Sequence, residues 1–247
     1  MEEILNKYHI KDEVIAIGVS GGADSLALVL QAAEELAVFG RKVVALTVEH
    51  GLRPTSAAEA EYVAALMQRF GIEHHILPWR GDKPQTGVEE AARQARYMLL
   101  GEWCHKNGVR VLLTAHHAKD QAETFLMRLQ RGSGLEGLCG IRECSRREGL
   151  VIIRPFLNVN PDDLRLYLQN RKIVWVEDES NLDTSFLRGK LRKFLPELAE
   201  NTGINVEKIC GAVQNLQSAE DFIEQQLDLL NQFWKKPEYT NEKWKSN

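Results

Sequence analysis

The sequence contains few cysteines, and their spacing argues against two kinds of site. The 247-residue chain has four, at positions 104, 139, 144 and 210, and none of them forms a C-x-x-C pair. Paired cysteines of that kind are typical of zinc ribbons and dithiol redox sites. We therefore expect reduced, structural thiols.

Long apolar runs, a basic leader and a strong net charge are also missing. No apolar run approaches the roughly 20 residues that span a bilayer. The first residues, Met1-Glu2-Glu3-Ile4, do not form a basic segment followed by an apolar core. We therefore expect a cytoplasmic protein with no membrane partner. The net charge of -4 argues against a protein that coats nucleic acid over its whole surface, although it permits a local basic face.

Apolar content is sufficient for a large core, and it is distributed in a regular pattern. Residues of this kind make up 44% of the chain, enough for one α/β domain and an appendage. Short apolar runs alternate with helix-length segments, which predicts a doubly wound, mainly parallel sheet with helices on both faces. The expected strands are 14–19, 42–48, 74–79 and 110–114, and the expected helices are 25–39, 56–70, 88–107 and 118–131.

Two further segments complete the predicted fold. The apolar run 150–156 precedes a helix that begins near Pro161 and ends near Asn170, a unit that extends the sheet. From Val206 to Trp234, apolar residues recur at intervals of three and four, as on one stripe of a long helix that packs on another element. We therefore divide the chain into residues 1–203, a catalytic α/β domain, and 204–247, a long helix with a polar tail.

The most informative motif is Ser20-Gly21-Gly22-Ala23-Asp24-Ser25, which lies between the first strand and the first long helix. Adjacent glycines let backbone N–H groups approach an anion, and the helix start adds a positive dipole end. A helix cap is the alternative interpretation, but the Asp24 carboxylate would repel phosphate unless a cation such as Mg²⁺ lay between them. The chain has no G-x-x-x-x-G-K-[ST] motif. We interpret the run as a pyrophosphate-binding turn.

Polar groups also follow the second strand and occupy the third predicted long helix. His50 and Arg53 come at the carboxyl end of the second strand and are candidates to face the same cleft. Ser56 and Glu59 have the spacing of a capping box, and we assign them mainly to that role. Arg93, Arg96 and Tyr97 share one helix face, where surface solvation is the competing interpretation.

The densest polar segment follows the fourth strand, from Thr114 to Thr124. It contains His116, His117 and the pair Asp120 and Glu123, whose i, i+3 spacing presents two carboxylates together on a helix. Such a pair suits an amine or a metal better than a phosphate. Helix capping and surface exposure are the alternatives for each residue taken alone.

Arginines gather in the second half of the chain despite the acidic total. They lie either in a contact with nucleic-acid phosphates or on a solvated surface. The candidates for phosphate contact are Arg128, Arg131, Arg188 and Arg192.

In combination, these motifs resemble the tRNA(Ile)-lysidine synthetases, a tRNA-modifying family of the N-type ATP pyrophosphatases (PP-loop family). The resemblance spans roughly residues 12 to 200 and is far more specific than any single motif. The matching residues are Ser20 to Ser25, His50 to Arg53 with Ser56, Arg93 with Arg96-Tyr97, Thr114 to His117, Asp120 to Thr124, Arg128-Leu129, Arg131 to Gly134, Arg154-Pro155-Phe156, Asp178 with Ser180-Asn181, Arg188, Arg192 and Pro196. Lys119 and Gly189 depart from the family pattern, and segment 204–247 corresponds to the remnant or start of a tRNA-binding region.

The resemblance implies a ligase reaction with ATP and Mg²⁺. The enzyme would adenylate the C2 oxygen of the wobble cytidine in an isoleucine tRNA with a CAU anticodon, releasing pyrophosphate. The ε-amine of free L-lysine would then displace AMP. A homodimer is a further possibility.

The same resemblance assigns roles to the candidate residues. Asp24 and Asp120 would be catalytic, with Asp24 also linked to the metal and Asp120, assisted by Glu123, orienting or deprotonating the lysine amine. The assignments for ATP are Ser20, Gly21, Gly22, Ala23, Asp24, Ser25, His50, Arg53 and His116; those for lysine or the adenylate are Arg93, His117, Asp120 and Glu123; those for tRNA are Arg128, Arg131, Arg188 and Arg192.

Three other functions remain open at this point. A cytidine-thiolating relative would need cysteine pairs, which the chain lacks. An amidating ligase such as an NAD or GMP synthetase shares the phosphate turn but would not explain the late basic motif. A non-catalytic nucleotide-binding module would not need both Asp24 and Asp120.

Overall fold

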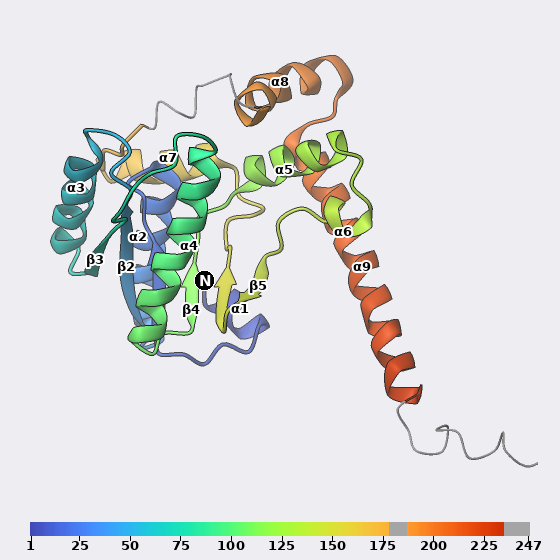
Figure 1. The fold of residues 1–247 in the computed structure, drawn as a ribbon, viewed down its shortest axis with the longest axis horizontal. Coiled ribbons are helices and arrows are strands. Elements are labelled where there is room, and N and C mark those ends of the chain that lie inside the picture. Colours follow the sequence, from blue (N-terminus) through green and yellow to red (C-terminus); the bar gives the residue numbers. More distant parts are fainter. Residues whose placement is uncertain (178–186, 235–247) are drawn as a thin grey trace, which may run out of the picture.

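Six strands form a single sheet in the order β3-β2-β1-β4-β6-β5, as seen in the computed structural model, which describes residues 1–177 and 187–234 (Figure 1). The first five strands in this order are parallel, and β5 pairs with β6 in the antiparallel direction. The strands are β1 (Val14–Gly18), β2 (Lys42–Glu49), β3 (Glu73–Pro78), β4 (Val111–Leu113), β5 (Cys144–Arg147) and β6 (Leu150–Ile153). The predicted mainly parallel sheet is confirmed, whereas β5 was not predicted.

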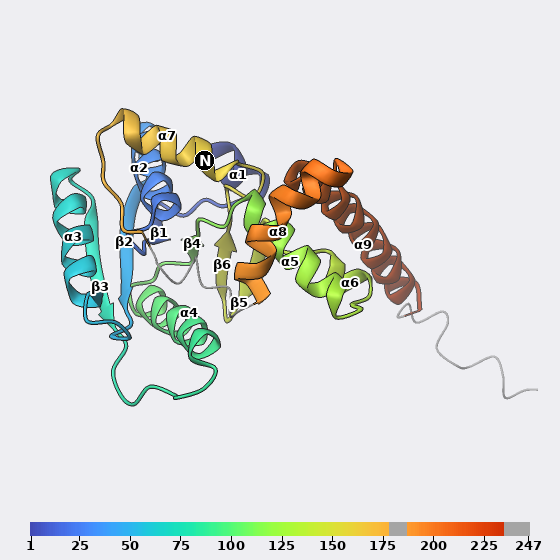
Figure 2. The ribbon, with the colours of Figure 1, turned by 90° about the horizontal axis from the view of Figure 1, so that it is seen from above.

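Helices cover both faces of the sheet, as Figure 2 shows. On one face, α2 and α7 pack with α1 and α3 around a core that includes the buried side chains of Leu28 and Leu168. On the other face, α4 contributes Leu100 and Cys104 to a second, smaller core. The helices are α1 (Glu2–Lys7), α2 (Ala23–Val38), α3 (Ser56–Arg69), α4 (Val88–Lys106) and α7 (Pro161–Asn170). Helix α1 was not predicted.

Beside the sheet lies a third group of helices, which leads from the sheet to the last described residues (Figure 2). These are α5 (Ala118–Gln130), α6 (Leu135–Leu138), α8 (Leu187–Thr202) and α9 (Val206–Trp234). Ala122 of α5, Leu195 of α8 and Ile209 of α9 form a small buried cluster. The contact of α9 with α5 confirms that the long helix packs on another element, and α6 and α8 were not predicted.

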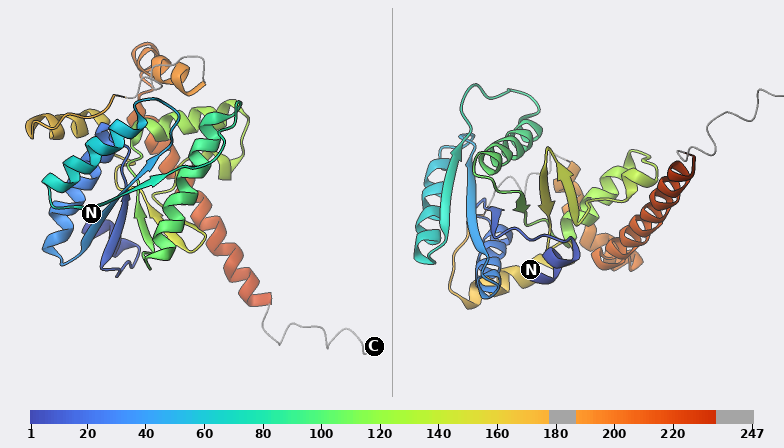
Figure 3. Two further views of the ribbon diagram at one scale, coloured as in Figure 1. Left: turned by 60° about the vertical axis from the view of Figure 1, so that its left-hand side comes forward. Right: turned by 90° about the horizontal axis from the view of Figure 1, so that it is seen from below.

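Helix α9 has two parts with different surroundings. Its first turns are buried through Ile209, Cys210 and Val213. Its last turns extend beyond α5 and α6 (Figure 3), and their large apolar side chains are exposed, Leu227 by 54% and Trp234 by 64%. The apolar stripe predicted from the sequence therefore continues past the surface that covers it.

One local prediction was wrong. We assigned Ser56 and Glu59 to a capping box, but Ser56 is the first residue of α3 and Thr55 is the N-cap, without a side-chain cap hydrogen bond. The Thr55 hydroxyl instead donates to Glu59 Oε1 at 2.7 Å. Across the described parts of the chain, no helix combines the length and apolarity that a bilayer crossing requires.

Candidate functional site

The phosphate-binding turn predicted from the sequence connects β1 to α2 at the carboxyl end of the central strand. β1 is buried on both faces of the sheet, which fixes the position of the turn. Gly22 is the N-cap of α2, and Ala23 is the first helical residue. The backbone N–H groups of the first helical turn are therefore directed at the space beyond β1, where an anion is stabilised by the helix dipole.

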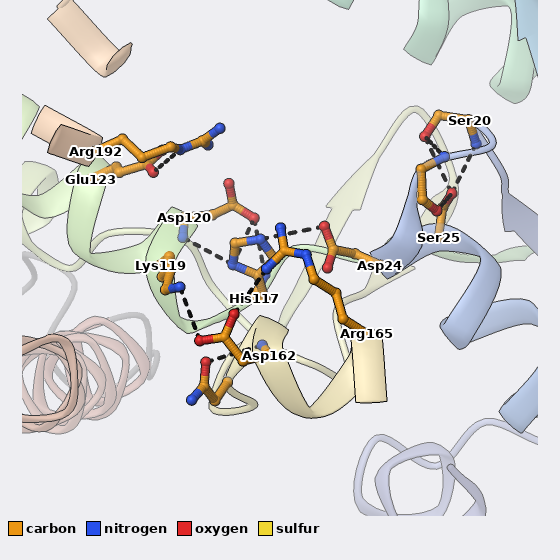
Figure 4. Close-up of polar contacts among 12 residues, drawn as sticks. Ser20, Asp24, Ser25, His117, Lys119, Asp120, Glu123, Asp162, Arg165 and Arg192 are labelled. Atoms are coloured by element: carbon orange, nitrogen blue, oxygen red, sulfur yellow. Dashed lines mark hydrogen bonds and ion pairs between the residues drawn. The ribbon is translucent and has the colours of Figure 1, made fainter. Parts of the chain in front are cut away.

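Two serine hydroxyls hold the turn in shape. Ser25 Oγ accepts from the Ser20 backbone N–H at 3.1 Å, lies 3.2 Å from Ser20 Oγ, and donates to the Gly22 carbonyl at 3.0 Å (Figure 4). The Gly22 N–H donates to Ser20 Oγ at 3.4 Å. These contacts preorganise the backbone without a ligand.

Gly21 has a backbone conformation that other residues rarely adopt. Its φ is +88°, and a Cβ atom there would lie 3.2 Å from Val63 Cγ2 and 3.3 Å from Val176 Cγ2. Its carbonyl accepts from the Val176 N–H at 2.9 Å, so the segment after α7 is attached to the turn. The turn therefore requires glycine at this position for two independent reasons.

His117 lies between the two carboxylates that we expected to be catalytic. Its Nε2 is 3.5 Å from Asp24 Oδ2, and its Nδ1 is 3.4 Å from Asp120 Oδ2 (Figure 4). His117 is also the N-cap of α5, where its Nδ1 accepts from the Asp120 N–H at 3.3 Å and its own N–H donates to Asp120 Oδ2 at 3.0 Å. This capping box places Asp120 beside the phosphate-binding turn.

The protonation of these groups follows from their neighbours. Burial lowers the pKa of His117, but its hydrogen bond with Asp24 and the charge of Asp120 outweigh burial and raise it overall. Burial opposes ionisation of Asp120, yet the nearby His117 and His116 rings and the backbone hydrogen bond lower its pKa. Asp120 is therefore held as a carboxylate.

Asp24 carries a buried oxygen for which residues 1–177 and 187–234 offer no hydrogen-bond partner. Its Oδ1 is buried and unpaired among the described residues, while its Oδ2 faces His117. Buried polar atoms normally have a partner. An unpaired carboxylate oxygen beside a phosphate-binding turn is a suitable ligand for Mg²⁺.

The two other histidines predicted at the site are half-buried and have lowered pKa values. Burial lowers the pKa of His116 to about 4, and its Nδ1 lies 3.1 Å from Thr114 Oγ1. Burial, followed by the charge of Arg96, likewise lowers the pKa of His50 to about 4. The Arg96 Nη2 atom is 3.4 Å from His50 Nε2, which joins α4 to the end of β2.

Glu123 is paired with two of the arginines that we assigned to tRNA. Its side chain is 0% exposed, and its oxygens lie 2.8 Å from Arg192 Nε and 3.0 Å from Arg188 Nε. Helix α8 is thus attached to α5 by charge as well as by Leu195. Both guanidinium groups already neutralise the Glu123 carboxylate. The predicted contact of Glu123 with lysine stays a prediction.

The remaining candidates lie farther from the phosphate-binding turn or have other partners. Arg53 is paired with Glu59 at 3.0 Å, and Arg128 Nη1 donates to the carbonyls of Gly137 and Gly140 at 2.7 and 2.9 Å. Arg131 is exposed beyond the end of α5. The motif residues Asp178, Ser180 and Asn181 fall outside the described residues.

Sequence reasoning did not identify two features of the site. It assigned Asp24 to the metal and His117 to lysine without joining them, and only the capping geometry of α5 reveals that contact. It also gave no role to Arg154, a buried guanidinium that donates to the Arg142 carbonyl at 2.8 Å and to Ser145 Oγ at 3.0 Å. The signal for Arg154 was present in the Arg154-Pro155-Phe156 motif.

A doubly wound sheet with a glycine turn after β1, and with carboxylate and imidazole groups at the same edge, defines a nucleotide-handling α/β protein. The match to the PP-loop domain family covers residues 1–198. The chain therefore belongs to the PP-loop family.

Among curated proteins, the chain is similar to enzymes named tRNA(Ile)-lysidine synthase. The one from Bradyrhizobium diazoefficiens is 44% identical over 76% of this chain and 53% of its own length. The one from Wolbachia pipientis wMel is 37% identical over 88% of this chain and 51% of its own length. The chain thus spans about half the length of these curated relatives.

Among solved structures, the fold is similar to that of the U34-tRNA thiolase NcsA from Methanococcus maripaludis with its 4Fe-4S cluster. The TM-score is 0.71 at 16% identity, and the match covers 83% of this chain and 72% of that one. At this identity the likeness concerns the fold alone.

Proposed function

We propose that this protein adenylates the C2 oxygen of the wobble cytidine of a CAU-anticodon isoleucine tRNA and joins free L-lysine to C2, with AMP as the leaving group. The observation that carries the proposal is the His117 imidazole, which lies 3.5 Å from Asp24 at the phosphate-binding turn and 3.4 Å from Asp120. A group that handles phosphate and a carboxylate suited to an amine thus share one edge of the sheet. The names of the curated relatives support the same reaction.

The first half-reaction needs the outer phosphates of ATP held and their charge neutralised. The turn from Ser20 to Ser25 would bind them through backbone N–H groups and hydroxyls. Asp24, through its unpaired Oδ1, would hold Mg²⁺, which would neutralise phosphate charge. No group of three or more His, Cys, Asp or Glu side chains suited to a metal occurs among the described residues, so phosphate and water would complete the coordination.

The second half-reaction needs the lysine ε-amine in its neutral form. In solution its pKa is about 10.4, so the amine arrives as an ammonium ion. Asp120 carries a negative charge because His117, His116 and a backbone hydrogen bond lower its pKa, and it would therefore attract that ammonium. A carboxylate with a low pKa is a weak base, which favours an orienting role for Asp120 over proton removal.

Lysine transfer and pyrophosphate release, measured in parallel with CAU-anticodon tRNA, test this proposal. We expect Asp24→Ala to abolish both signals, whereas Asp120→Ala should lower lysine transfer by about 100-fold or more. Asp162→Asn is the matched control, because Asp162 is an exposed carboxylate near this edge that contacts Lys119 and Arg165. Full lysine transfer in Asp120→Ala would refute its role, and pyrophosphate release without lysine transfer in the wild type would point to another nucleophile.

The same proposal includes the cellular compartment, the division of the chain into domains and the oligomeric state. A reaction of tRNA, ATP and free lysine would take place in the cytoplasm. Residues 1–203 would form the catalytic unit, with α9 leading toward a tRNA-binding region. We also propose a homodimer, supported by the exposed apolar end of α9, and sedimentation over a range of concentrations would test it.

A further inference from the structure

A groove on the outer side of α4 lies next to the site and has no role in the reaction above. Its volume is about 560 Å³, and its lining includes Trp79 after β3, Arg93 and Met98 on α4, and Arg147 at the β5–β6 turn. This volume is within the range of small-molecule and nucleotide pockets. Glu90 and Glu148 also line it.

Aromatic rings and cationic groups lie close together in this groove and beside it. The Tyr97 ring lies 5.5 Å from the Arg93 guanidinium carbon and 5.5 Å from that of Arg147. At the other end, Lys83 Nζ is 4.3 Å from the centre of the Trp79 ring. Arginine planes and aromatic rings are the groups on which unstacked bases lie, and the charges suit the phosphates between them.

Buried groups support this surface from behind. Arg154, only 9% exposed, lies near the Tyr97 side chain, which partly offsets the lowering of its guanidinium pKa by burial, and its Nε has no partner among the described residues. The only carboxylate paired with Arg147 among the described residues is its neighbour Glu148, at 3.6 Å and 83% exposed. An exposed ion pair of this kind contributes little to stability, so Glu148 would compete only weakly with a phosphate for Arg147.

Side-chain contacts connect the groove to the edge of the sheet that carries the candidate site. Trp79 packs edge-on against His50, with ring centres 5.9 Å apart, and His50 contacts Arg96 of α4. The charge of Arg93 also contributes to the lowered pKa of His116. A single-stranded nucleic acid that places one base at the site could therefore continue along α4.

We propose that this groove binds single-stranded RNA, namely the anticodon-loop nucleotides that flank the modified base. Trp79 would stack on a base, and Arg93 and Arg147 would contact phosphates or stack on bases. The inference rests on the proposed function for the identity of the RNA, while the chemistry of the groove calls only for unpaired nucleotides.

The test measures binding of a fluorescein-labelled CAU anticodon stem-loop to the full chain by anisotropy. Arg147→Glu should weaken binding by about tenfold or more. The slope of log affinity against log salt concentration should also become less steep by about the value of one phosphate contact. Trp79→Ala should weaken binding by about fivefold or more, the loss of one stacked base. Arg146→Glu is the matched control, because neighbouring residues of β5 point to opposite faces, and it should change affinity less than about twofold.

Equal losses in the Arg146 and Arg147 variants would indicate only general surface charge and would overturn the proposal. Unchanged affinity in Arg147→Glu would also overturn it. A parallel assay of lysine transfer separates the two proposals. If the wild type binds the stem-loop through Arg147 but transfers no lysine, the proposed reaction fails and the groove stands. If lysine transfer is normal and the KM for tRNA is the same in wild type and Arg147→Glu, only the groove fails.

Discussion

The two adjacent glycines of the phosphate-binding turn differ in how strictly the structure requires glycine, although they look equivalent in the sequence. Gly21 has a φ of +88° and has Val63 and Val176 close to where a Cβ would lie, whereas Gly22 has only Ser20 Oγ at 3.6 Å. We expect Gly21→Ala to destabilise the fold by about 2 kcal/mol and to weaken ATP binding. Gly22→Ala should cost less than about 1 kcal/mol. Urea unfolding and ATP titration would measure both, and equal effects would contradict the interpretation.

Glu123 is a residue whose contribution to stability can be separated from its contribution to the reaction. It is fully buried and paired with Arg188 and Arg192, which are partly exposed. Removing its charge would leave two guanidinium groups without their anion, and we expect Glu123→Gln to lower the free energy of unfolding by about 2 kcal/mol. Glu136→Gln on the exposed side of α6 is the control, with a change within about 0.5 kcal/mol. No difference between them in urea unfolding would argue against this role for the pairing.

At the scale of elements, α9 provides a direct comparison of covered and uncovered turns. Val213 is 0% exposed and lies near Gly140, whereas Leu227 is 54% exposed on the same apolar stripe. We expect Val213→Ala to cost about 2 kcal/mol, since it removes buried methyl groups and leaves a cavity. Leu227→Ala should cost less than about 0.5 kcal/mol in the monomer. A large, concentration-dependent cost for Leu227→Ala, measured by thermal unfolding, would show that a second copy covers this surface.

For the whole molecule, half-buried histidines with lowered pKa values predict how stability depends on pH. Burial lowers the pKa of both His50 and His116 to about 4, and it also lowers the pKa of His74. Between pH 6.5 and about 4 the unfolded chain therefore binds more protons than the folded one, and stability falls as the pH falls. Two such histidines give a slope of up to about 2.7 kcal/mol per pH unit.

His117 acts in the opposite direction and in a different range. Because its folded pKa is raised, its contribution is fully present below the unfolded value of 6.5 and is lost as the pH rises through the folded value. Urea unfolding from pH 4 to 8 measures both ranges. The double variant His50→Gln with His116→Gln should flatten the acid slope, and an unchanged slope would mean that other groups cause it.

The sequence predicts the parallel core well because its signal is local. β1, β2, β3 and the long helices are continuous apolar or amphipathic segments, and each lies within a few residues of its expected range. β5 escaped prediction because its residues, Cys144 to Arg147, are not apolar, and its place at the edge depends on hydrogen bonds to β6. Helix α8 escaped because its basic residues were interpreted as RNA contacts or as a solvated surface, although Leu195 and two arginines attach it to α5.

In the candidate site, too, local features could be predicted from the sequence, whereas contacts between distant segments could not. The residues of the turn follow from one short motif, so their position could be predicted from the strand before them and the helix after them. The contact between Asp24 and His117 joins positions 24 and 117, and it depends on how α5 begins beside α2. Ser56 was misassigned because the Ser-x-x-Glu spacing also occurs when the helix starts one residue earlier, with Thr55 as the N-cap and Ser56 as the first helical residue.

The side chain that begins α5 has a consequence for the order of events at the site. His117 Nδ1 can accept from the Asp120 amide only while that nitrogen keeps its lone pair. A proton taken up there would remove this acceptor and leave an N–H that points at the Asp120 carboxylate instead. The His117 ring therefore cannot carry a second proton while it accepts the hydrogen bond from the Asp120 amide. A proton released near Asp24 and taken up by His117 would loosen the start of α5, more than ninety residues away in the chain.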